Sequence, residues 1–225
     1  RRARAGSRER APAWYPCGTM WFRRPPSPPS RSDRWTAFAT QLGAEPAGDA
    51  AERLRRFLDL DDAEVRDVHV LRRPGAPSLF LFDVVRRRSG PLGQVVRWSS
   101  WALLRGDRPV SAVSFRAAPR REAVLESLEA SRTGAVRVDL SAWPEVDARL
   151  AVLARDAAAA RSLLTPVVTA ALGDLLALGP GAAVVVAERH LLARVDVEED
   201  GDPADLGPMV GGLLALAERL SSAAP

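Results

Sequence analysis

An acidic stretch near the C-terminus, DVEEDGD at residues 196–202, has the spacing of a metal-binding loop. Its acidic residues alternate and are followed by Gly201, as in the first half of a calcium loop. Such a loop needs a glutamate at its twelfth position, which is Gly207 here, and a helix before it, whereas HLLARV has the pattern of a strand. We therefore interpret the stretch as a strand end, a turn and a helix cap, with Asp202 as the cap and Pro203 as the first helical residue.

The chain has two histidines, and neither belongs to a recognisable catalytic or zinc-binding motif. His69 lies in a predicted strand on the face opposite Val68 and Val70, which places it in solvent or at a sheet edge. His190 is expected at the tip of a hairpin spanning residues 182–197. The sequence also lacks the GxSxG, P-loop and GxGxxG motifs, so nothing in it supports a serine hydrolase or a nucleotide-dependent enzyme. We accordingly assign no catalytic residue, cofactor or metal ligand from the sequence.

Three consecutive arginines, Arg86, Arg87 and Arg88, lie at a predicted hairpin tip and could form an anion-binding face. Trp98 and Trp101, on the returning strand, could add aromatic stacking. Positions 98 and 101 of one strand, however, point to opposite faces, so the two rings cannot line a single surface. An exposed tip beside two sheet tryptophans is the simpler interpretation. The residues retained as candidates for binding are Arg86, Arg87, Arg88, His69 and His190.

The basic charge of the chain is concentrated at its N-terminus. Residues 1–34 hold nine of the 32 basic residues and two of the 28 acidic residues, and therefore carry +7. The rest of the chain carries −3, although the whole chain has a net charge of +4 and a pI of about 10.6. All the basic residues are arginines, a bias typical of GC-rich coding. Because the expected folded part is slightly acidic, a nucleic-acid partner is disfavoured.

Residues 1–34 are rich in proline, serine and arginine and cannot bury a core, so we expect a disordered segment ahead of the folded domain. Residues 1–19 precede the first methionine, Met20, and could lie upstream of the native start. Cys17 is the single cysteine, which excludes a disulfide within the chain and cysteine-based metal sites. No secretion signal is recognisable, so a cytoplasmic location is expected, with peripheral attachment to the cytoplasmic membrane as the alternative.

Residues 163–187 are long and apolar enough to resemble a membrane span, with Asp174 as their single charged residue. Pro166 and the Gly-Pro-Gly sequence at 179–181 interrupt them, and helical apolar spacing gives way to a β-branched run after the break. A core helix, a turn and a buried strand therefore explain the segment better than a span. Thr165 is expected to cap that helix.

The apolar periodicity predicts a single α+β domain over residues 35–223. Its expected sheet is antiparallel, built from hairpins and a four-strand meander, with helices covering one face and an amphipathic helix at the C-terminus. Helices are expected near residues 35–42, 51–60, 122–130, 165–175 and 206–220, with a further N-cap at Asp156. Strands are expected near residues 68–70, 79–85, 94–104 and 110–115, which form the meander, near 136–140 and 150–153, and in the hairpin 184–197.

Three stretches of the C-terminal half resemble an uncharacterised family of proteins from GC-rich, actinobacterial-type bacteria. They are residues 136–172, which include the sequence LLTP, residues 184–196 and residues 204–220. The resemblance implies a strand, a helix beginning at LLTP, a hairpin and a final amphipathic helix, and it supplies no catalytic residues. Many members carry a membrane helix ahead of the soluble domain, whereas this sequence has the proline-rich segment there, so membrane attachment is not carried over.

These observations support three hypotheses about function. The first is a non-enzymatic α+β module that binds a protein or a small ligand, with a protein partner and a second copy of the chain both left open. The second is an enzyme whose site is assembled from residues distant in sequence, for which His69, Asp83 and Asp139 are the first candidates. The third is a peripheral anion or membrane binder that acts through residues 1–34.

Overall fold

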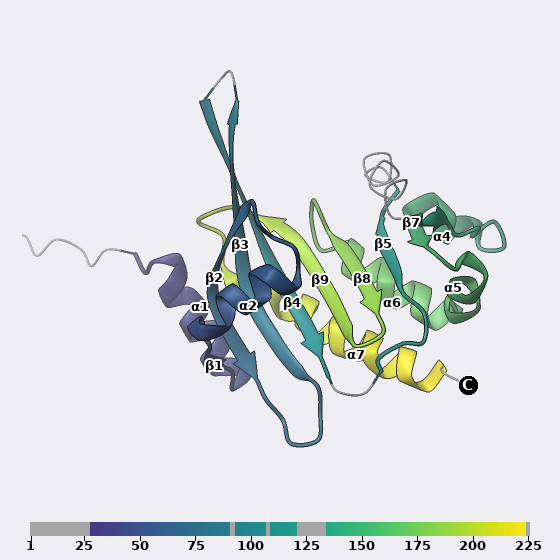
Figure 1. Cartoon of the computed structure of the whole chain (residues 1–225), viewed down its shortest axis with the longest axis horizontal. Helices are drawn as coiled ribbons and strands as arrows, with labels where there is room; N and C mark the ends of the chain where they lie inside the picture. Colours follow the sequence, from purple (N-terminus) through teal and green to yellow (C-terminus); the bar gives the residue numbers. More distant parts are fainter. Residues whose placement is uncertain (1–27, 91–92, 107–108, 121–133, 224–225) are drawn as a thin grey trace, which may run out of the picture.

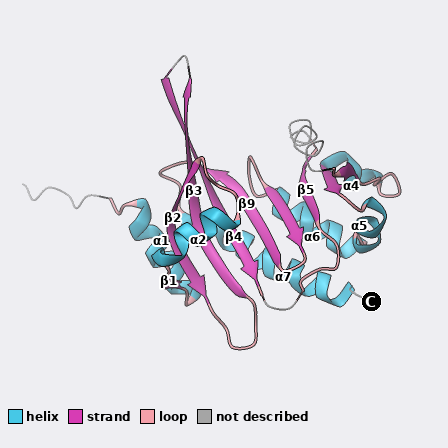
Figure 2. Ribbon diagram, viewed as in Figure 1, coloured by secondary structure: helices cyan, strands magenta, loops and turns pink. Residues whose placement is uncertain are grey.

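The computed structural model describes residues 28–90, 93–106, 109–120 and 134–223, which form an α+β fold (Figures 1 and 2). Within these ranges, nine strands form one open sheet in the order β1-β2-β3-β4-β9-β8-β5-β7-β6, and the neighbouring strands are antiparallel. The strands are β1 (Glu45–Pro46), β2 (Ala63–Leu71), β3 (Ser78–Gly90), β4 (Gly93–Arg105), β5 (Phe115–Pro119), β6 (Val136–Arg137), β7 (Leu150–Ala154), β8 (Ala183–Ala187) and β9 (His190–Val197). The predicted α+β class with an antiparallel sheet is confirmed.

Helices lie on both faces of this sheet. In Figure 1, α2 lies in front of the sheet and contacts β2, whereas α6 and α7 lie behind it and contact β8 and β9. The prediction that helices cover one face is therefore incomplete. The helices are α1 (Arg31–Leu42), η1 (Gly48–Ala50), α2 (Ala51–Phe57), α4 (Pro144–Arg149), α5 (Ala157–Leu163), α6 (Pro166–Leu176), η2 (Pro203–Leu206) and α7 (Gly207–Ala223).

The central strands bury side chains on both faces of the sheet, and this explains their nearly continuous apolar sequences. On β3, Leu79 and Leu81 face the larger core, which also contains Leu213 of α7. The alternate residues Phe82 and Val84 face a smaller core beneath α2. Two separate cores thus pack against opposite faces of the same strand.

The C-terminal helix α7 follows the predicted apolar stripe. Its buried side chains recur at intervals of three and four residues, as on one face of a helix. α7 also packs along α6, so these two helices together close the larger core. The buried residues of α7 are Met209, Val210, Leu213, Leu216 and Leu220.

Two helix starts predicted from capping residues are confirmed. Asp156 accepts a hydrogen bond from the backbone N–H of Ala159 at 2.9 Å and so caps α5. Thr165 accepts one from Val168 at 3.3 Å and caps α6, whose first residue is proline. Each cap satisfies a backbone donor that the helix itself leaves unpaired.

The acidic stretch at residues 196–202 is a strand end, a turn and a cap, as predicted. The N–H of Gly201 donates to the carbonyl of Glu198 at 3.1 Å, which closes the turn. Asp202 then accepts a hydrogen bond from the N–H of Ala204 at 2.9 Å and caps η2, which runs directly into α7. Where the structure describes the chain, no group of three or more His, Cys, Asp or Glu side chains could hold a metal ion.

The predicted Gly-Pro-Gly turn joins α6 to β8. Gly181 has a φ of 63°, a conformation that favours glycine, and a Cβ at this position would overlap the carboxylate of Asp196. The N–H of Asp196 donates to the carbonyl of Pro180 at 2.9 Å. The turn therefore needs glycine both for its backbone angle and for the close approach of β9.

The helix α1 begins earlier than the predicted domain boundary. The sequence placed residues 31–34 in the N-terminal segment, whereas α1 includes them and begins after the N-cap Ser30. Ser30 and Asp33 form a capping box: the N–H of Asp33 donates to the Ser30 hydroxyl, and the N–H of Ser30 donates to the Asp33 carboxylate. Arg31 is only 9% exposed, so it belongs to the folded domain.

The meander is shorter than predicted. β2, β3 and β4 follow one another, but the next neighbour of β4 is β9. Of residues 110–115 only Phe115 lies in a strand, as the first residue of β5, which pairs with β7 and β8 and not with β4. The N–H groups of Val110 and Ser111 donate instead to the carbonyl of Glu188, in the turn between β8 and β9. β9 pairs with β4 from Trp98 to Arg105, and this long pairing occupies the edge that the meander would have used.

Two other predictions concern the chain on either side of β6. The strand expected at residues 136–140 is limited to Val136–Arg137, although the N–H of Val138 still donates to the carbonyl of Val152 at 2.8 Å. The helix expected at residues 122–130 lies outside the described residues. The short helix α4 was not indicated by the apolar pattern, and none of its side chains is fully buried.

Among the described residues, no single helix is long and apolar enough to cross a membrane. α5 and α6 meet the criteria of length and composition only as a pair, and the pair is bent by 94°. The core helix, turn and buried strand predicted within residues 163–187 correspond to α6, the turn around Pro180 and β8.

Candidate functional site

A buried polar cluster surrounds Asp83, the charged residue that interrupts the apolar sequence of β3. The Asp83 side chain is completely buried and accepts hydrogen bonds from Arg31 Nε at 2.5 Å, from Trp35 Nε1 at 2.7 Å and from the Ser100 hydroxyl at 2.6 Å. The Arg31 guanidinium also donates to the carbonyls of Glu198 and Gly201. The charge is therefore paired and its oxygens are satisfied, and the cluster ties α1 and the turn before η2 to the sheet.

His69 lies beside this cluster, and its predicted exposure is wrong. The side chain is 4% exposed, and its ring stacks on Trp35 with the centroids 6.1 Å apart. Its Nδ1 lies 2.8 Å from the carbonyl oxygen of Asp67. Its face was predicted correctly, since Val68 and Val70 face the smaller core and His69 faces the other way. The exposure is wrong because α1, which supplies Trp35, covers that second face of β2.

The three candidates for an enzymatic site are not brought together. His69 and Asp83 contact the same Trp35 side chain, within the closed cluster. Asp139 is largely exposed, and its carboxylate accepts hydrogen bonds from the N–H of Ser141 and from Arg161. Those bonds hold the pKa of Asp139 below its ordinary value, with the Ser141 N–H as the main cause. Asp139 thus serves a local turn rather than a site shared with His69.

His190 is the first residue of β9, next to the hairpin turn, where the sequence placed it. It is half-buried, and its ring meets the Phe57 ring edge-on at 5.1 Å. Burial lowers the pKa of His190, and the nearby positive charge of Arg105 lowers it further. The Arg105 guanidinium itself lies 4.4 Å from the centroid of the Phe57 ring.

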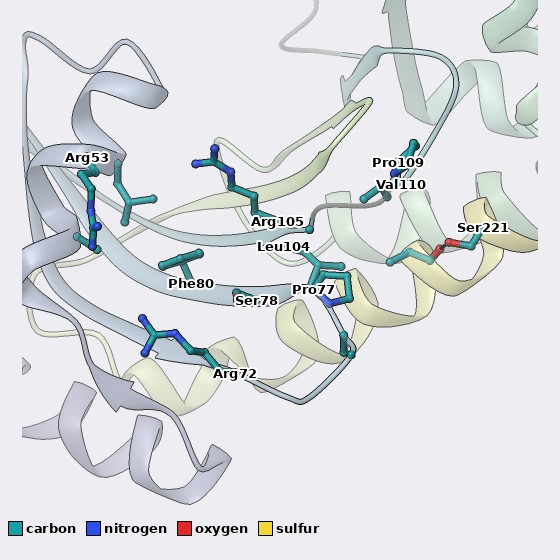
Figure 3. Close-up of a pocket in the computed structure, with 16 residues that line it drawn as sticks. Arg53, Arg72, Pro77, Ser78, Phe80, Leu104, Arg105, Pro109, Val110 and Ser221 are labelled. Carbon is teal, nitrogen blue, oxygen red and sulfur yellow. Dashed lines mark hydrogen bonds between the residues drawn. The ribbon is translucent and has the colours of Figure 1, made fainter.

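Arg105 also belongs to a large open groove at one end of the sheet (Figure 3). The groove has a volume of about 990 Å³, and its walls come from α2, the turn between β2 and β3, the end of β4 and the last turns of α7. Arg53, Arg72 and Arg105 surround Phe80, as Figure 3 shows. Leu104, Pro77 and Val110 continue the apolar lining toward α7. We name this feature the arginine groove.

The described residues around the arginine groove do not carry enough negative charge to neutralise its arginines. Arg53 pairs with Asp49 at 2.8 Å, but both side chains are more than two-thirds exposed, so the pair is weak. Arg72 has no ion pair or hydrogen bond of its side chain within the described part of the chain. None of the described lining residues is acidic. The site offers guanidinium groups over an apolar floor, an arrangement that suits an anionic group attached to an apolar one.

The arginine groove was not predictable from short sequence motifs, because its arginines are far apart in the chain. One signal was nevertheless present. β2 and β4 are both antiparallel to β3, so both end at the same edge of the sheet, and each is followed by a turn. Arg72 directly follows β2 and Arg105 is the last residue of β4, whereas Arg53 comes from α2 and could be placed only by packing.

The arginines predicted at a hairpin tip lie far along the β3–β4 ribbon and outside the groove. Arg86 lies 3.5 Å from a carboxylate oxygen of Asp62, and Arg87 lies 2.9 Å from one of Glu64. Arg88 is exposed and follows them on the same strand. The strands continue past all three, so these residues are in the ribbon rather than in its turn.

The prediction that Trp98 and Trp101 face opposite ways is confirmed. The guanidinium groups of Arg31 and Arg66 lie 5.6 and 5.7 Å from the Trp98 ring, on the face that carries Asp83. Trp101 packs on Phe82 in the smaller core. Neither ring is available as a stacking platform, because both are more than 90% buried.

A second cavity of about 580 Å³ lies between α4, α6 and the ends of β5 and β7. Its described lining contains both arginines and acids, among them Arg120, Arg149, Glu145 and Asp174. Because these charges are of both signs, the cavity favours no single class of ligand as clearly as the arginine groove does.

Comparison with known proteins gives a fold but no family. No family model and no curated protein matches the chain. Among solved structures, the crystal structure of the mycobacterial trehalose monomycolate transport factor A, TtfA, is similar, with a TM-score of 0.57 and 11% sequence identity. The match covers 86% of this chain and 96% of that one. At this level of identity the likeness shows that the chain shares the fold of that transport factor.

Proposed function

We propose that this chain is a non-enzymatic binding module and that the arginine groove holds its ligand, a small molecule with an anionic group and an apolar part. The observation that carries the proposal is the convergence of Arg53, Arg72 and Arg105 around Phe80, with no acidic residue in the described lining. Guanidinium groups bind phosphates and carboxylates through paired, charge-assisted hydrogen bonds, and the apolar floor would take the rest of the ligand.

The contrast with the Asp83 cluster supports binding rather than catalysis. The polar groups around Asp83 bond to one another in the interior, whereas those of the groove are exposed and reach open space. Catalysis by acid–base chemistry needs a titratable pair that a substrate can reach. The ionisable groups in the described lining of the groove are arginines, which stay charged and therefore bind but do not exchange protons.

The similar solved structure supports a role of the same general kind. Its protein is named as a transport factor. We therefore infer that ligand carriage or presentation within a transport process is the best-supported setting for the groove of this chain. The ligand of this chain is proposed from its own arginines and apolar floor, and not from the substrate in the other protein's name.

The proposal is tested by isothermal titration with three probes at concentrations below micelle formation. They are octyl phosphate, octyl glucoside and inorganic phosphate, which separate the anionic head from the apolar chain. We expect octyl phosphate to bind at least about 10-fold more tightly than either of the others, since it alone uses both parts of the groove.

Two variants and a matched control complete this test. Arg72→Gln should weaken octyl phosphate binding by about 10-fold, and the double variant Arg72→Gln/Arg105→Gln should weaken it further. Arg73→Gln removes the same charge from an exposed neighbour outside the groove and should leave the affinity unchanged. Equal affinities of the double variant and the unaltered chain, or equal binding of octyl glucoside and octyl phosphate, would refute the proposed function.

A further inference from the structure

The ribbon formed by β3 and β4 extends beyond the rest of the sheet (Figure 1). The last residue of β3 that pairs with β2 is Arg86, opposite Ala63, and the first residue of β4 that pairs with β9 is Trp98. Among the described residues, 87–90 therefore pair only with 93–96, and Arg97 pairs only with Arg86. We call residues 87–90 and 93–97 the arm. Figure 1 shows the arm standing clear of the helices and of the other strands.

No described strand pairs with either outer edge of the arm. Along each edge of a two-stranded ribbon, every second residue turns its N–H and C=O groups outward, where another strand can bond to them. Two strands alone are also marginally stable in water, and a third strand stabilises them. The backbone of the arm thus has both the free hydrogen-bonding groups and the energetic reason to accept an added strand.

The arm places like charges directly opposite each other. Arg86, at its base, pairs in register with Arg97, and this arrangement destabilises a ribbon unless an anion lies between the two. Arg88 lies two residues along from Arg86 and therefore on the same face. Among the described residues, neither Arg88 nor Arg97 has an ion pair or a side-chain hydrogen bond, whereas Arg86 and Arg87 have Asp62 and Glu64 near them.

Apolar side chains are exposed beside these charges. Val95 is 56% exposed and lies opposite Arg88, and Val96 is 43% exposed and lies opposite Arg87. β-Branched residues on both faces of a ribbon are typical of strands that are covered. No described residue buries either valine. Within the described part of the chain, the arm therefore exposes two valines, the unpaired guanidinium groups of Arg88 and Arg97, and main-chain groups without partners.

We propose that the arm is a docking strand for a partner protein, which adds an acidic extended segment along one of its edges. The main chain of that segment would pair with the free edge, and its carboxylates would lie beside Arg88 and Arg97. Its alternate, apolar side chains would then lie on the opposite face of the ribbon, where they would cover Val96. This mode of recognition takes its affinity from main-chain hydrogen bonds and its specificity from side chains on alternate positions.

Charge complementarity favours an acidic protein segment over a second copy of the chain or a nucleic acid. A second copy of the chain would bring one row of arginines against another, and such repulsion is a common protection against pairing between edges. A nucleic acid would be repelled by the chain after residue 34, which carries −3 even with the arginines of the arm included. A short acidic segment meets only the local positive charge of the arm.

The test uses the full chain and a fluorescein-labelled peptide of eight alternating glutamate and valine residues. Fluorescence anisotropy at physiological ionic strength should show saturable binding. A peptide with glutamine in place of glutamate should bind at least about 10-fold more weakly, since it lacks the charges. A glutamate–valine peptide N-methylated at every second residue should also bind at least about 10-fold more weakly, since its main chain cannot complete the added strand.

Variants of the arm and of the groove control for each other. Arg88→Gln/Arg97→Gln should lose at least about 10-fold in affinity for the acidic peptide, and Arg88→Lys/Arg97→Lys should retain most of it. Arg72→Gln/Arg105→Gln loses the same charge outside the arm and should bind the peptide as the unaltered chain does. Octyl phosphate binding should weaken in Arg72→Gln/Arg105→Gln and stay unchanged in Arg88→Gln/Arg97→Gln. A failure of the arm proposal can therefore be told apart from a failure of the groove proposal.

Hydrogen exchange gives a second measure that does not depend on variants. Amides of residues 87–90 and 93–97 should exchange more slowly when the peptide is bound, and amides in the groove should not change. The proposal is overturned if the peptide does not bind at millimolar concentration, or if N-methylation leaves the affinity intact. It is also overturned if a DNA duplex or a phosphatidylglycerol vesicle binds through the arm more tightly than the peptide, because the partner would then belong to another class.

Discussion

Arg31 and Arg72 carry the same guanidinium group in opposite surroundings. Arg31 is buried and donates hydrogen bonds to Asp83, to Ser100 and to two backbone carbonyls. Arg72 is exposed at the arginine groove and has no ion pair within the described residues. The first arginine holds α1 against the sheet, and the second leaves a positive charge available to a ligand.

The difference matters because every basic residue of this chain is an arginine. Residue type therefore cannot separate structural from functional positions here. What separates them is how many of the five N–H donors already have partners and how far the group lies from water. The buried arginine should contribute to stability and not to binding, and the arginine of the groove should do the reverse.

The largest effect should come from breaking the buried cluster. Arg31→Met leaves the Asp83 carboxylate buried without its counter-charge, and we expect a loss of about 3–5 kcal/mol in the free energy of unfolding. The double variant Arg31→Met/Asp83→Asn removes both charges and keeps an oxygen that can accept from Trp35, so it should regain most of the loss. Urea denaturation measures both. A loss of less than about 1 kcal/mol in the single variant would mean that the cluster does not clamp α1.

A smaller effect is expected at the turn that supplies the Gly201 carbonyl to Arg31. Asp202→Ala removes the N-cap of η2 and should cost about 1 kcal/mol of stability, seen as a lower midpoint of thermal unfolding. Asp200→Ala, at an exposed neighbour in the same turn, should change stability by less than about 0.5 kcal/mol. Equal melting temperatures for the two variants would count against the role of Asp202 as a cap.

The stability of the protein should depend on pH through His190, which lies beside Arg105 of the arginine groove. The pKa of His190 is lowered from 6.5 by burial and by Arg105, so the unfolded chain takes up a proton at a higher pH than the folded chain does. This contribution to stability is complete above pH 6.5 and is lost as the pH falls through the lowered pKa of the folded state. His190→Gln should therefore reduce the drop in stability between pH 7 and pH 5. Parallel stability curves for the variant and the unaltered chain would exclude the effect.

The smallest effect on stability should come from Arg72. Arg72→Gln should shift the free energy of unfolding by no more than about 0.5 kcal/mol, because its exposed guanidinium has no partner among the described residues. The same variant should bind octyl phosphate about 10-fold more weakly. A variant that is strongly destabilised would show that Arg72 has a structural role and would remove the contrast with Arg31.

Local signals in the sequence were sufficient for much of the fold. Asp156, Thr165 and Asp202 cap helices because a short polar side chain satisfies a free N–H within three residues, and such an interaction can be found in a sequence window. The hairpin of β8 and β9 and the stripe of α7 follow from periodicity in the same way. The acidic stretch at residues 196–202 also belongs to this class.

Features that depend on contacts between residues far apart in the chain could not be predicted in this way. The pattern of residues 110–115 suits a strand, but β9 occupies the edge of β4 at which they were expected to pair. A short stretch of sequence cannot reveal that residues 110–115 and β9 compete for this edge, because the two segments are far apart in the chain. His69 was placed on the correct face, opposite Val68 and Val70, but its burial was missed because the helix that covers this face, α1, comes from a distant part of the chain. The start of α1 was missed because Arg31, which resembles the exposed arginines before it, is buried by a partner 52 residues away.

The sequence by itself determined the α+β class, the antiparallel pairing within hairpins, the caps and the amphipathic C-terminal helix. Each of these depends on interactions between residues close together in the chain. Only the tertiary structure decided the strand order, the two cores, the burial of Arg31 with Asp83 and the convergence of Arg53, Arg72 and Arg105. The physical reason is that the role of an arginine depends on the atoms within hydrogen-bonding distance of its guanidinium group. The fold brings those atoms from distant parts of the chain.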